Sequence, residues 1–399
     1  MQRTLGQPGA GVAGRLLPVA MDWQKLLEAE QAVLDLEAEE AESQHGGSTG
    51  PEIPNPFVFG NPVLEQDTNV FTGRQDIVRQ IEETVLGTEQ APILLLHGPR
   101  RMGKTSILNQ LPRLLGPYFA PAVVDCQNPA VTGSAATLLS YLSRALCAGL
   151  QRRHVNIHPL QREWLDHEPF TVFDEWLDDL ESIMPRGMRA LLCLDEYENL
   201  ASWRDAAQNN ALLDAMRHVL QFRPRVVLLF SGVRTFEEQG PGWTSRFLSV
   251  RRIRVSFLRR EEVLPLLTRP IPHFGMSYAE GGLESIFRAT SGQPFLIQAL
   301  AFELVQLLNE EQRKQASAAD VDRAIPRALV SSSEYFANLW FDTGAEGQTI
   351  LRALARAEPA PDFPKARAWL RAQDVLTEAG TFAVPMVEQW VKKEKIDTG

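Results

Sequence analysis

Residues 98–106 combine glycine, lysine and hydroxyl side chains at a spacing suited to binding phosphate groups. Gly98 and Gly103 let backbone N–H groups turn toward phosphate oxygens, and Lys104 adds a positive charge for the β- and γ-phosphates. Thr105 offers a hydroxyl to Mg²⁺. The pattern G-x-x-x-x-G-K-S/T therefore predicts that ATP or ADP is bound by Gly98, Pro99, Arg100, Arg101, Met102, Gly103, Lys104, Thr105 and Ser106, with Lys104 also serving catalysis.

Two arginines inside this loop, Arg100 and Arg101, are unusual for such a motif. A guanidinium matches the geometry of phosphate or carboxylate groups, so either side chain could reach the nucleotide or a neighbouring acid. The alternative is that both are solvated arginines on an exposed turn.

An acidic pair follows a second apolar run and supplies the carboxylates that nucleotide hydrolysis needs. Leu191 to Leu194 end in Asp195 and Glu196. We expect Asp195 to hold Mg²⁺ together with Thr105, and Glu196 to act as general base on the attacking water. Glu198 is interpreted as a solvated residue at a helix start, with a role as reserve carboxylate as the alternative.

Polar residues after a third apolar run are further candidates. Ser231 follows Val226 to Phe230, and we assign it a catalytic role in sensing the γ-phosphate or orienting the water; a plain strand-ending turn is the alternative. Arg234 could contact phosphate or a neighbouring subunit. Candidates for an arginine finger, each equally interpretable as a solvated charge, are Arg246, Arg251 and Arg252.

The elements that must position these residues alternate between strands and helices. Continuous apolar runs, typical of strands covered on both faces, occur at Pro92 to Leu96, Ala122 to Asp125, Ala190 to Leu194 and Val226 to Phe230, with a weaker one at Ile253 to Phe257. Helical patterns lie at 70–85, 106–115, 135–150, 172–183 and 206–220. This alternation predicts an α/β fold, a three-layer P-loop NTPase with a mostly parallel sheet.

After residue 258 the alternation stops. Helical patterns at 261–267, 282–290, 294–308 and 318–328 predict a helical region, and 346–390 has the outline of a winged helix: helix, helix, hairpin. The predicted organisation is a disordered segment 1–20, an acidic amphipathic helix and linker 21–53, a P-loop ATPase core 54–258, a helical lid 259–340 and a winged-helix domain 341–399.

Together these motifs resemble the STAND branch of P-loop ATPases, close to the archaeal-type and origin-recognition-like AAA proteins. The segments that carry the resemblance are PNPFVFGNPV (54–63), FTGR (71–74), HGPRRMGKTS (97–106), LLCLDEYENL (191–200) and TSGQPFLIQAL (290–300). The resemblance implies an ATP- or ADP-dependent switch with a helical lid. It also implies that Phe71, Gly73 and Arg74 line the adenine side of the pocket, and that Pro294 closes over the base.

Charge and composition bear on the partners. The net charge of -10 does not favour nucleic acid as the main partner, and three scattered cysteines fit a reducing cytosol. No segment has the length and apolar character of a membrane span, so we expect a cytoplasmic protein without membrane contact. Members of the branch usually carry effector and sensor domains, which are not evident here. Either the effector or sensor is therefore a separately encoded protein, or the chain is a shortened member of the branch. We expect a nucleotide-dependent homo-oligomer and a defence-related role, with the helix 22–43 as docking element.

Two alternatives remain open. One is a DNA-associated ATPase of replication or transposition that uses the basic side of its winged helix at Lys365, Arg367 and Arg371. The other is a degenerate nucleotide-binding scaffold, which the complete set of Lys104, Thr105, Asp195 and Glu196 disfavours. A metal site at His154, His158 and His167 is disfavoured by the intervening polar residues and Pro159.

Overall fold

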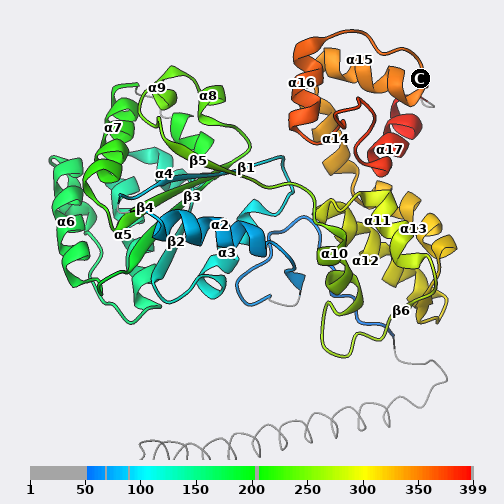
Figure 1. Ribbon diagram of the computed structural model, residues 1–399, viewed down its shortest axis with the longest axis horizontal. Helices are drawn as coiled ribbons and strands as arrows, with labels where there is room; N and C mark the ends of the chain where they lie inside the picture. Colours follow the sequence, from blue (N-terminus) through cyan, green and yellow to red (C-terminus); the bar gives the residue numbers. More distant parts are fainter. Residues whose placement is uncertain (1–51, 68–69, 89, 203–205, 397–399) are drawn as a thin grey trace, which may run out of the picture. The chain divides into compact units, whose positions relative to one another are not determined.

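A parallel β-sheet lies at the centre of the part of the fold that carries the candidate residues (Figure 1). The computed structural model describes residues 52–67, 70–88, 90–202 and 206–396. The chain divides into two compact units, 1–52 and 53–399, and the fold described is that of the second. The predicted disordered segment 1–20 and acidic helix 22–43 lie outside the described residues.

The sheet of the described residues has five strands in the order β2-β3-β4-β1-β5, and every neighbouring pair is parallel. The carboxyl ends of parallel strands lie at the same end of the sheet. In the strand register, Asp195 is paired with Ser231, and Ser231 is paired with Leu96. The phosphate loop, after β1, and the acidic pair, at the end of β3, therefore lie at the same end of the sheet, although β4 separates β1 from β3. The strands are β1 (Ile93–His97), β2 (Phe119–Asp125), β3 (Arg189–Asp195), β4 (Val226–Gly232) and β5 (Val250–Arg254).

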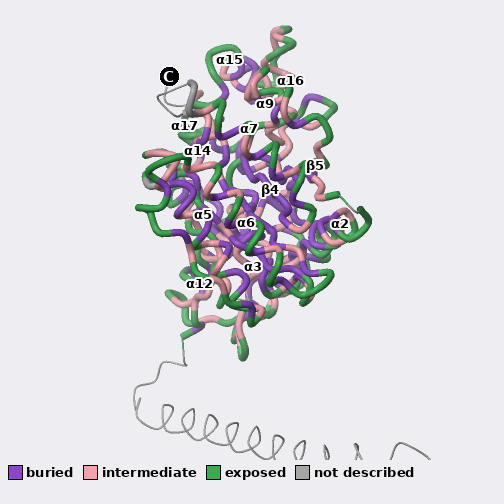
Figure 2. The backbone as a smooth tube through the Cα atoms, turned by 90° about the vertical axis from the view of Figure 1, so that its left-hand side faces the viewer, coloured by how far each residue is buried: buried purple, intermediate pink, exposed green. Residues whose placement is uncertain are grey.

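Two layers of helices cover the faces of this sheet. On one face, α2 (Gln75–Leu86) and α3 (Lys104–Leu114) share a core with alternate strand residues such as Leu94 and Leu96. On the other face, α5 (Ala135–Gln151), α6 (Pro169–Ile183) and α7 (Ala206–Phe222) lie over the remaining alternate residues. Strands buried on both faces read as continuous apolar runs, and every residue of β4 is buried (Figure 2). The α/β three-layer prediction is confirmed.

Short elements complete this part of the chain. They are α4 (Pro129–Gly133), η2 (Arg162–Leu165), η3 (Tyr197–Ser202), α8 (Phe236–Gln239) and α9 (Pro241–Thr244). The turn η3 follows the acidic pair directly. Its residue Tyr197 is fully buried and packs against Phe230, Phe236 and Trp243, so the segment after β3 is anchored in the core.

The helices after residue 258 form one further core. Buried side chains from the lid and from the C-terminal region pack together in it, and Phe336 stacks on Trp390 at 5.6 Å. The lid elements are α10 (Arg260–Thr268), β6 (Ser277–Tyr278), α11 (Gly282–Thr290), α12 (Pro294–Glu310), β7 (Gln315–Ala316) and α13 (Ala318–Ser331). The C-terminal helices are α14 (Ser333–Asp342), α15 (Gly344–Ala355), α16 (Pro364–Ala372) and α17 (Pro385–Lys395), orange to red in Figure 1.

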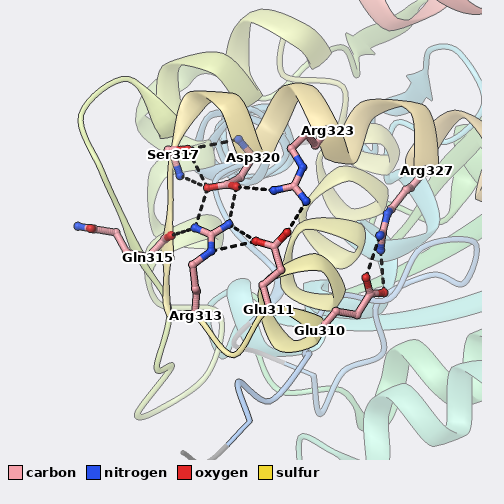
Figure 3. A network of polar contacts seen from close by, with 8 residues as sticks. All are labelled: Glu310, Glu311, Arg313, Gln315, Ser317, Asp320, Arg323 and Arg327. Carbon is pink, nitrogen blue, oxygen red and sulfur yellow. Dashed lines mark hydrogen bonds and ion pairs between the residues drawn. The ribbon is translucent and has the colours of Figure 1, made fainter.

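A polar network joins α12 to α13 on the lid (Figure 3). Ser317 and Asp320 form a reciprocal cap at the start of α13, and the Asp320 carboxylate also accepts from the Arg313 guanidinium at 2.5 and 3.1 Å. Glu311 pairs with Arg313 and Arg323, and Arg327 pairs with Glu310 through two bonds of 2.8 Å. The network therefore ties the end of one lid helix to the start of the next.

Three features differ from the sequence-based expectations. The fifth strand runs from Val250 to Arg254 instead of 253–257, because the chain beyond it turns toward the lid, where the Leu258 N–H donates to the Gly292 carbonyl. Helix α14 was not predicted. The expected C-terminal hairpin consists of a single antiparallel bridge between Leu376 and Phe382, and α17 follows it. No helix in the described part of the chain is long and apolar enough to cross a membrane.

Candidate functional site

The phosphate loop runs from the end of β1 to the start of α3. A Cβ on Gly98 would lie 2.1 Å from the carbonyl oxygen of Val255, so no side chain fits between the loop and the chain after β5. Gly103 has a φ of 84° and faces open space, and it precedes Lys104, the first residue of α3. The glycines thus have separate roles: Gly98 permits close packing, and Gly103 permits the left-handed turn that opens the loop.

Lys104 is folded back over this loop. Its Nζ donates to the carbonyl oxygens of Gly98 and Pro99, each at 2.9 Å, and its side chain is buried. Burial lowers the pKa of Lys104, and the nearby carboxylates of Glu196 and Asp195 oppose this shift. A buried ammonium with only neutral carbonyl acceptors gains strongly from an anion, so phosphate is a well-matched ligand.

Asp195 receives two hydroxyl groups on its carboxylate. Thr105 Oγ1 donates to Oδ2 at 2.6 Å, and Ser231 Oγ donates to Oδ1 at 2.6 Å. The hydroxyl of Thr105 and the carboxylate of Asp195 are adjacent hard oxygen atoms, and this donor set fits Mg²⁺. Ser231 was expected to sense the γ-phosphate. It is instead fully buried, and its hydroxyl is directed onto Asp195.

Glu196 has a positive φ of 50°, which turns it out of the strand direction. Its side chain lines two adjoining cavities and has no hydrogen-bond or ion-pair partner within the described part of the chain. Burial raises the pKa of Glu196, with Lys104 as the main opposing charge. A half-buried carboxylate without a protein partner beside a phosphate loop is suited to accept a proton from water.

The first of these cavities, of about 700 Å³, extends from Lys104 and Thr105 to an apolar end. Phe71 and Arg74 line it, as does Pro294 of the lid, and Gly73 does not. A Cβ on Gly73 would meet the Glu262 side chain at 2.5 Å, so this glycine contacts the lid. The residues that the family resemblance assigned to adenine are therefore at the cavity, apart from Gly73.

Arg74 lines the cavity and also forms hydrogen bonds to two other segments of the chain. Its side chain is buried, and Nη2 donates to the carbonyl oxygen of Met102 in the phosphate loop at 3.0 Å. Its backbone N–H donates to Glu262 Oε1 at 2.9 Å. Arg74 thereby connects the phosphate loop to the lid.

A segment with no expected role, 53–64, forms one wall of the cavity. At one end the Ile53 N–H donates to Asn309 and the Val58 N–H donates to Gln298, both on α12. At the other end the Val63 N–H donates to Ser106 Oγ at 3.0 Å, and Asn109 donates back to the Val63 carbonyl at 3.1 Å. We call residues 53–64 the strap. It spans the distance from the lid to the helix that follows the phosphate loop.

The two loop arginines differ in their surroundings. Arg101 has a φ of 64°, donates to the Gly60 carbonyl of the strap, and lies 5.6 Å from the centre of the Phe295 ring of the lid. Arg100 is exposed, lines both cavities, and makes no hydrogen bond or ion pair with any described residue. Arg101 therefore bridges three segments of the fold, whereas Arg100 remains available to a ligand.

Residues at the end of β2 belong to the site and were missed. Asp125 lies opposite Asp195 in the sheet register, and both Asp125 and Gln127 line the first cavity. An acid at the end of an apolar run was the available signal, the same signal that singled out Asp195.

The second cavity, of about 920 Å³, adjoins the first and shares Arg100, Glu196 and the strap residues Phe59 and Gly60 with it. Glu198, Arg234 and residues of α14 and α16 line it. The interpretation of Glu198 as a solvated residue is wrong. Its Oε1 accepts from the backbone N–H groups of Val233 and Arg234, and its Oε2 is buried without a partner.

Several other candidate cations are engaged elsewhere. Arg246 forms a two-bond pair with Asp214, and Arg252 pairs with Glu237, whereas Arg251 is exposed and forms no side-chain pair with any described residue. On α16, Arg367 donates to the carbonyl oxygens of Ala360 and Pro361. The Nε of Arg371 is buried, so Lys365 is the member of that basic group whose side chain is exposed.

Comparisons with known proteins agree with this geometry. Residues 61–361 match the family model described as Novel STAND NTPase 1. The Walker-type ATPase of Pyrococcus abyssi superposes with a TM-score of 0.60 at 18% identity, over 84% of this chain and 99% of that chain. The ORC2 protein of Aeropyrum pernix, in its ADPNP-ADP complexes, gives a TM-score of 0.51 at 13% identity, over 85% of this chain and 96% of that chain. Curated protein sequences give no significant match.

Proposed function

Because the chain belongs to the Novel STAND NTPase 1 family, we propose that it is a switch ATPase that binds ATP, hydrolyses it slowly and couples nucleotide state to assembly with a partner. The observation that carries this proposal is the bridged carboxylate of Asp195, held between Thr105 of the phosphate loop and Ser231 of β4. An unpartnered Glu196 adjoins it. These groups are those that phosphoryl transfer to water requires.

In this proposal the residues divide the reaction among them. Lys104 leaves its two carbonyl acceptors for the phosphates, and Thr105 and Asp195 would hold Mg²⁺, which when bound neutralises charge on the phosphate oxygens. Glu196 accepts a proton as a water oxygen bonds to the γ-phosphorus. The bond from that phosphorus to the bridging oxygen breaks, and ADP and phosphate result. Ser231 keeps Asp195 oriented.

Arg100 and Arg234 are proposed to contact the γ-phosphate or the charge that develops on it. Both side chains are exposed, both line the cavity beside Glu196, and neither forms a side-chain hydrogen bond or ion pair with a described residue. A guanidinium in such a position stabilises the equatorial oxygens during transfer. Release of phosphate would leave these cations without their ligand, and this makes the site responsive to nucleotide state.

The switching part of the proposal is supported by how many segments meet at the nucleotide cavity. The strap contacts both α12 and α3, Arg74 contacts both the phosphate loop and Glu262, and Arg101 contacts both Gly60 and Phe295. A nucleotide that moves the loop must therefore act on the lid as well. We propose that this movement controls a homo-oligomer or a separately encoded effector or sensor.

Light scattering tests the assembly. The mass of the parent is measured without nucleotide, with ADP and with a non-hydrolysable ATP analogue, and Lys104→Ala serves as the variant that cannot respond. We expect a larger mass with the analogue than with ADP in the parent, and one mass for the variant in all three conditions. A single mass for the parent throughout would remove assembly of the chain with itself from the proposal.

A further inference from the structure

We propose that Glu198 is a positioning residue for hydrolysis, whose carboxylate holds the turn Gly232–Arg234 beside the γ-phosphate side of the site. The inference rests on the proposed function, because it assigns to Arg234 and Glu196 the roles given above. Glu198 itself touches no reacting atom in this account. It acts through the backbone of the turn that carries Arg234.

Three hydrogen bonds connect the segment after β3 to the turn after β4. Glu198 Oε1 accepts from the Val233 N–H at 2.6 Å and from the Arg234 N–H at 2.8 Å. The Tyr197 hydroxyl donates to the Arg234 carbonyl oxygen at 2.8 Å. Both backbone polar groups of Arg234 are thus bound by two consecutive side chains of η3, so the position of its guanidinium depends on that turn.

The contact is also sterically matched. A Cβ on Gly232 would lie 2.3 Å from both carboxylate oxygens of Glu198. The carboxylate therefore lies directly against the Gly232 backbone, and only glycine leaves room for it. A solvated glutamate would place no such restriction on a residue at the end of another strand.

The same short turn holds Glu196. The Asn199 side chain donates to the Glu196 carbonyl oxygen at 2.8 Å, and the Asn199 N–H donates to it at 3.0 Å. Tyr197 anchors the turn through its ring, which is fully buried among Phe230, Phe236 and Trp243. One anchored turn therefore determines the positions of both the proposed base, Glu196, and the proposed cation, Arg234. Glu198 connects this turn to Arg234.

The second oxygen of Glu198 indicates that the carboxylate belongs to the site. Oε2 is buried and has no hydrogen-bond partner, and Glu198 lines the cavity of about 920 Å³ that Glu196 and Arg234 also line. Buried polar atoms without a partner are rare, and such an atom beside a cavity is commonly satisfied by an ordered water. A water held in that cavity would supply the donor, so Glu198 needs no contact with the reacting atoms.

Four variants test the inference by steady-state ATP hydrolysis and by hydrogen exchange of the Val233 and Arg234 amides. Glu198→Ala removes the acceptor, and Glu198→Asp keeps the charge but shortens the side chain by one methylene. Glu198→Gln keeps an oxygen that accepts both N–H groups. Glu237→Gln, on the neighbouring α8, is the control, because this exposed glutamate pairs with Arg252 and lines neither cavity.

We expect Glu198→Ala and Glu198→Asp to lower kcat on the order of 10²-fold, the effect of displacing a reacting group by about 1 Å, with little change in KM. Amide exchange at Val233 and Arg234 becomes faster in both. Glu198→Gln recovers most of kcat and slow exchange, and the control matches the parent. If Glu198→Ala does not fold, Glu198→Asp decides the matter, since it preserves size and charge more closely.

Failure of this inference and failure of the proposed ATPase function would give different results. Parent kcat and slow exchange in Glu198→Asp would overturn the inference while leaving the ATPase proposal intact. A Glu198→Gln variant as inactive as Glu196→Gln would also overturn it, because the carboxylate would then act as a base. A parent that binds ATP without hydrolysing it would contradict the proposed function, and the exchange rates would still report whether Glu198 holds the turn.

Discussion

Asp195 has its two carboxylate oxygens occupied by hydroxyl groups from different segments. Thr105 comes from the first turn after the phosphate loop, and Ser231 comes from β4, the strand that separates β1 from β3. Because Ser231 is completely buried, it cannot exchange this bond for water. The carboxylate is thus held in one orientation before any ligand arrives, as an ion-binding acid requires.

The pH dependence of hydrolysis follows from Glu196 and Lys104. Burial raises the pKa of Glu196 and lowers the pKa of Lys104. Glu196 must be ionised to accept a proton, so activity falls as pH drops through its raised pKa, above the ordinary range of a glutamate. Lys104 must be charged, so activity also falls at alkaline pH, below the ordinary range of a lysine. The measurement is kcat/KM against pH, corrected for protonation of ATP.

The control for this profile is Glu196→Asp, whose shorter side chain places the carboxylate in a different environment. Its acid limb is expected to move while the alkaline limb stays in place. An acid limb of the parent at the pKa of a free glutamate would contradict the assignment of Glu196 as the titrating base.

At the scale of elements, the strap and the lid enclose the nucleotide cavity from two directions. Phe59 of the strap packs edge-on against Phe295 and Phe302 of α12, at 5.7 and 5.5 Å. Gln293 caps α12 by accepting from the Leu296 N–H at 2.6 Å, and it is fully buried. The lid wall is therefore built on a rigid helix start, and the strap is held against it by aromatic contacts.

The polar network between α12 and α13 stabilises the lid by charge. The Arg313 guanidinium, together with Ser317, lowers the pKa of Asp320, and the Arg323 guanidinium, with Arg313, lowers that of Glu311 to about 2. A carboxyl whose pKa is lower in the folded state stabilises the fold above its unfolded pKa, near 3.9 for aspartate. That contribution is lost as pH falls through the lower folded value.

We expect Asp320→Ala to reduce the free energy of unfolding at neutral pH by roughly 1–3 kcal/mol, since it removes a helix cap and a charged hydrogen bond. Denaturant unfolding at neutral pH and again below pH 4 provides the measurement, and the difference from the parent should shrink at the lower pH. Glu310→Ala, which removes an exposed pair with Arg327 on the same helices, is the control and should resemble the parent. An equal loss at both pH values would contradict the charge argument.

The sequence predicted elements well where burial leaves a local pattern. The apolar runs of β1, β2, β3 and β4 were recognisable as strands because their alternate residues face two helical layers. The fifth strand was misplaced because its exposed arginines, Arg251, Arg252 and Arg254, hide the pattern. The strap has no periodicity at all, since its backbone hydrogen bonds go to side chains of α12 and α3.

The residues of the candidate site likewise divide into those that could be predicted from a local pattern and those that could not. Gly98 to Thr105 and the pair Asp195 and Glu196 were predictable because their chemistry resides in consecutive residues. The contacts of Glu198 and Arg74 were not, because their partners lie 35 and 188 residues away, at Val233 and Glu262. A carboxylate near a strand end looks alike in sequence whether it is solvated or accepts two backbone N–H groups.

At the scale of the second unit, residues 53–399, the C-terminal helices contact the sheet through few polar groups. Asp374 accepts from Arg254 at 2.7 Å and from Ser256 at 2.9 Å, so the end of α16 is joined to the end of β5. Aromatic rings also connect the lid to α14: the ring of Phe295 lies 4.8 Å from that of Tyr335, which lies 5.1 Å from that of Phe336. Phe336 in turn stacks on Trp390 of α17, so the nucleotide-dependent movement of Arg101 that we propose would have a packed route from Phe295 to α17.

We propose that this site hydrolyses ATP with Glu196 as base. It is tested by measuring ATP binding and multiple-turnover phosphate release for the parent and Glu196→Gln, with Glu237→Gln as the matched control. We expect Glu196→Gln to bind ATP as the parent does and to release phosphate at least about 10²-fold more slowly, with the control unchanged. A Glu196→Gln variant that releases phosphate as fast as the parent would contradict it.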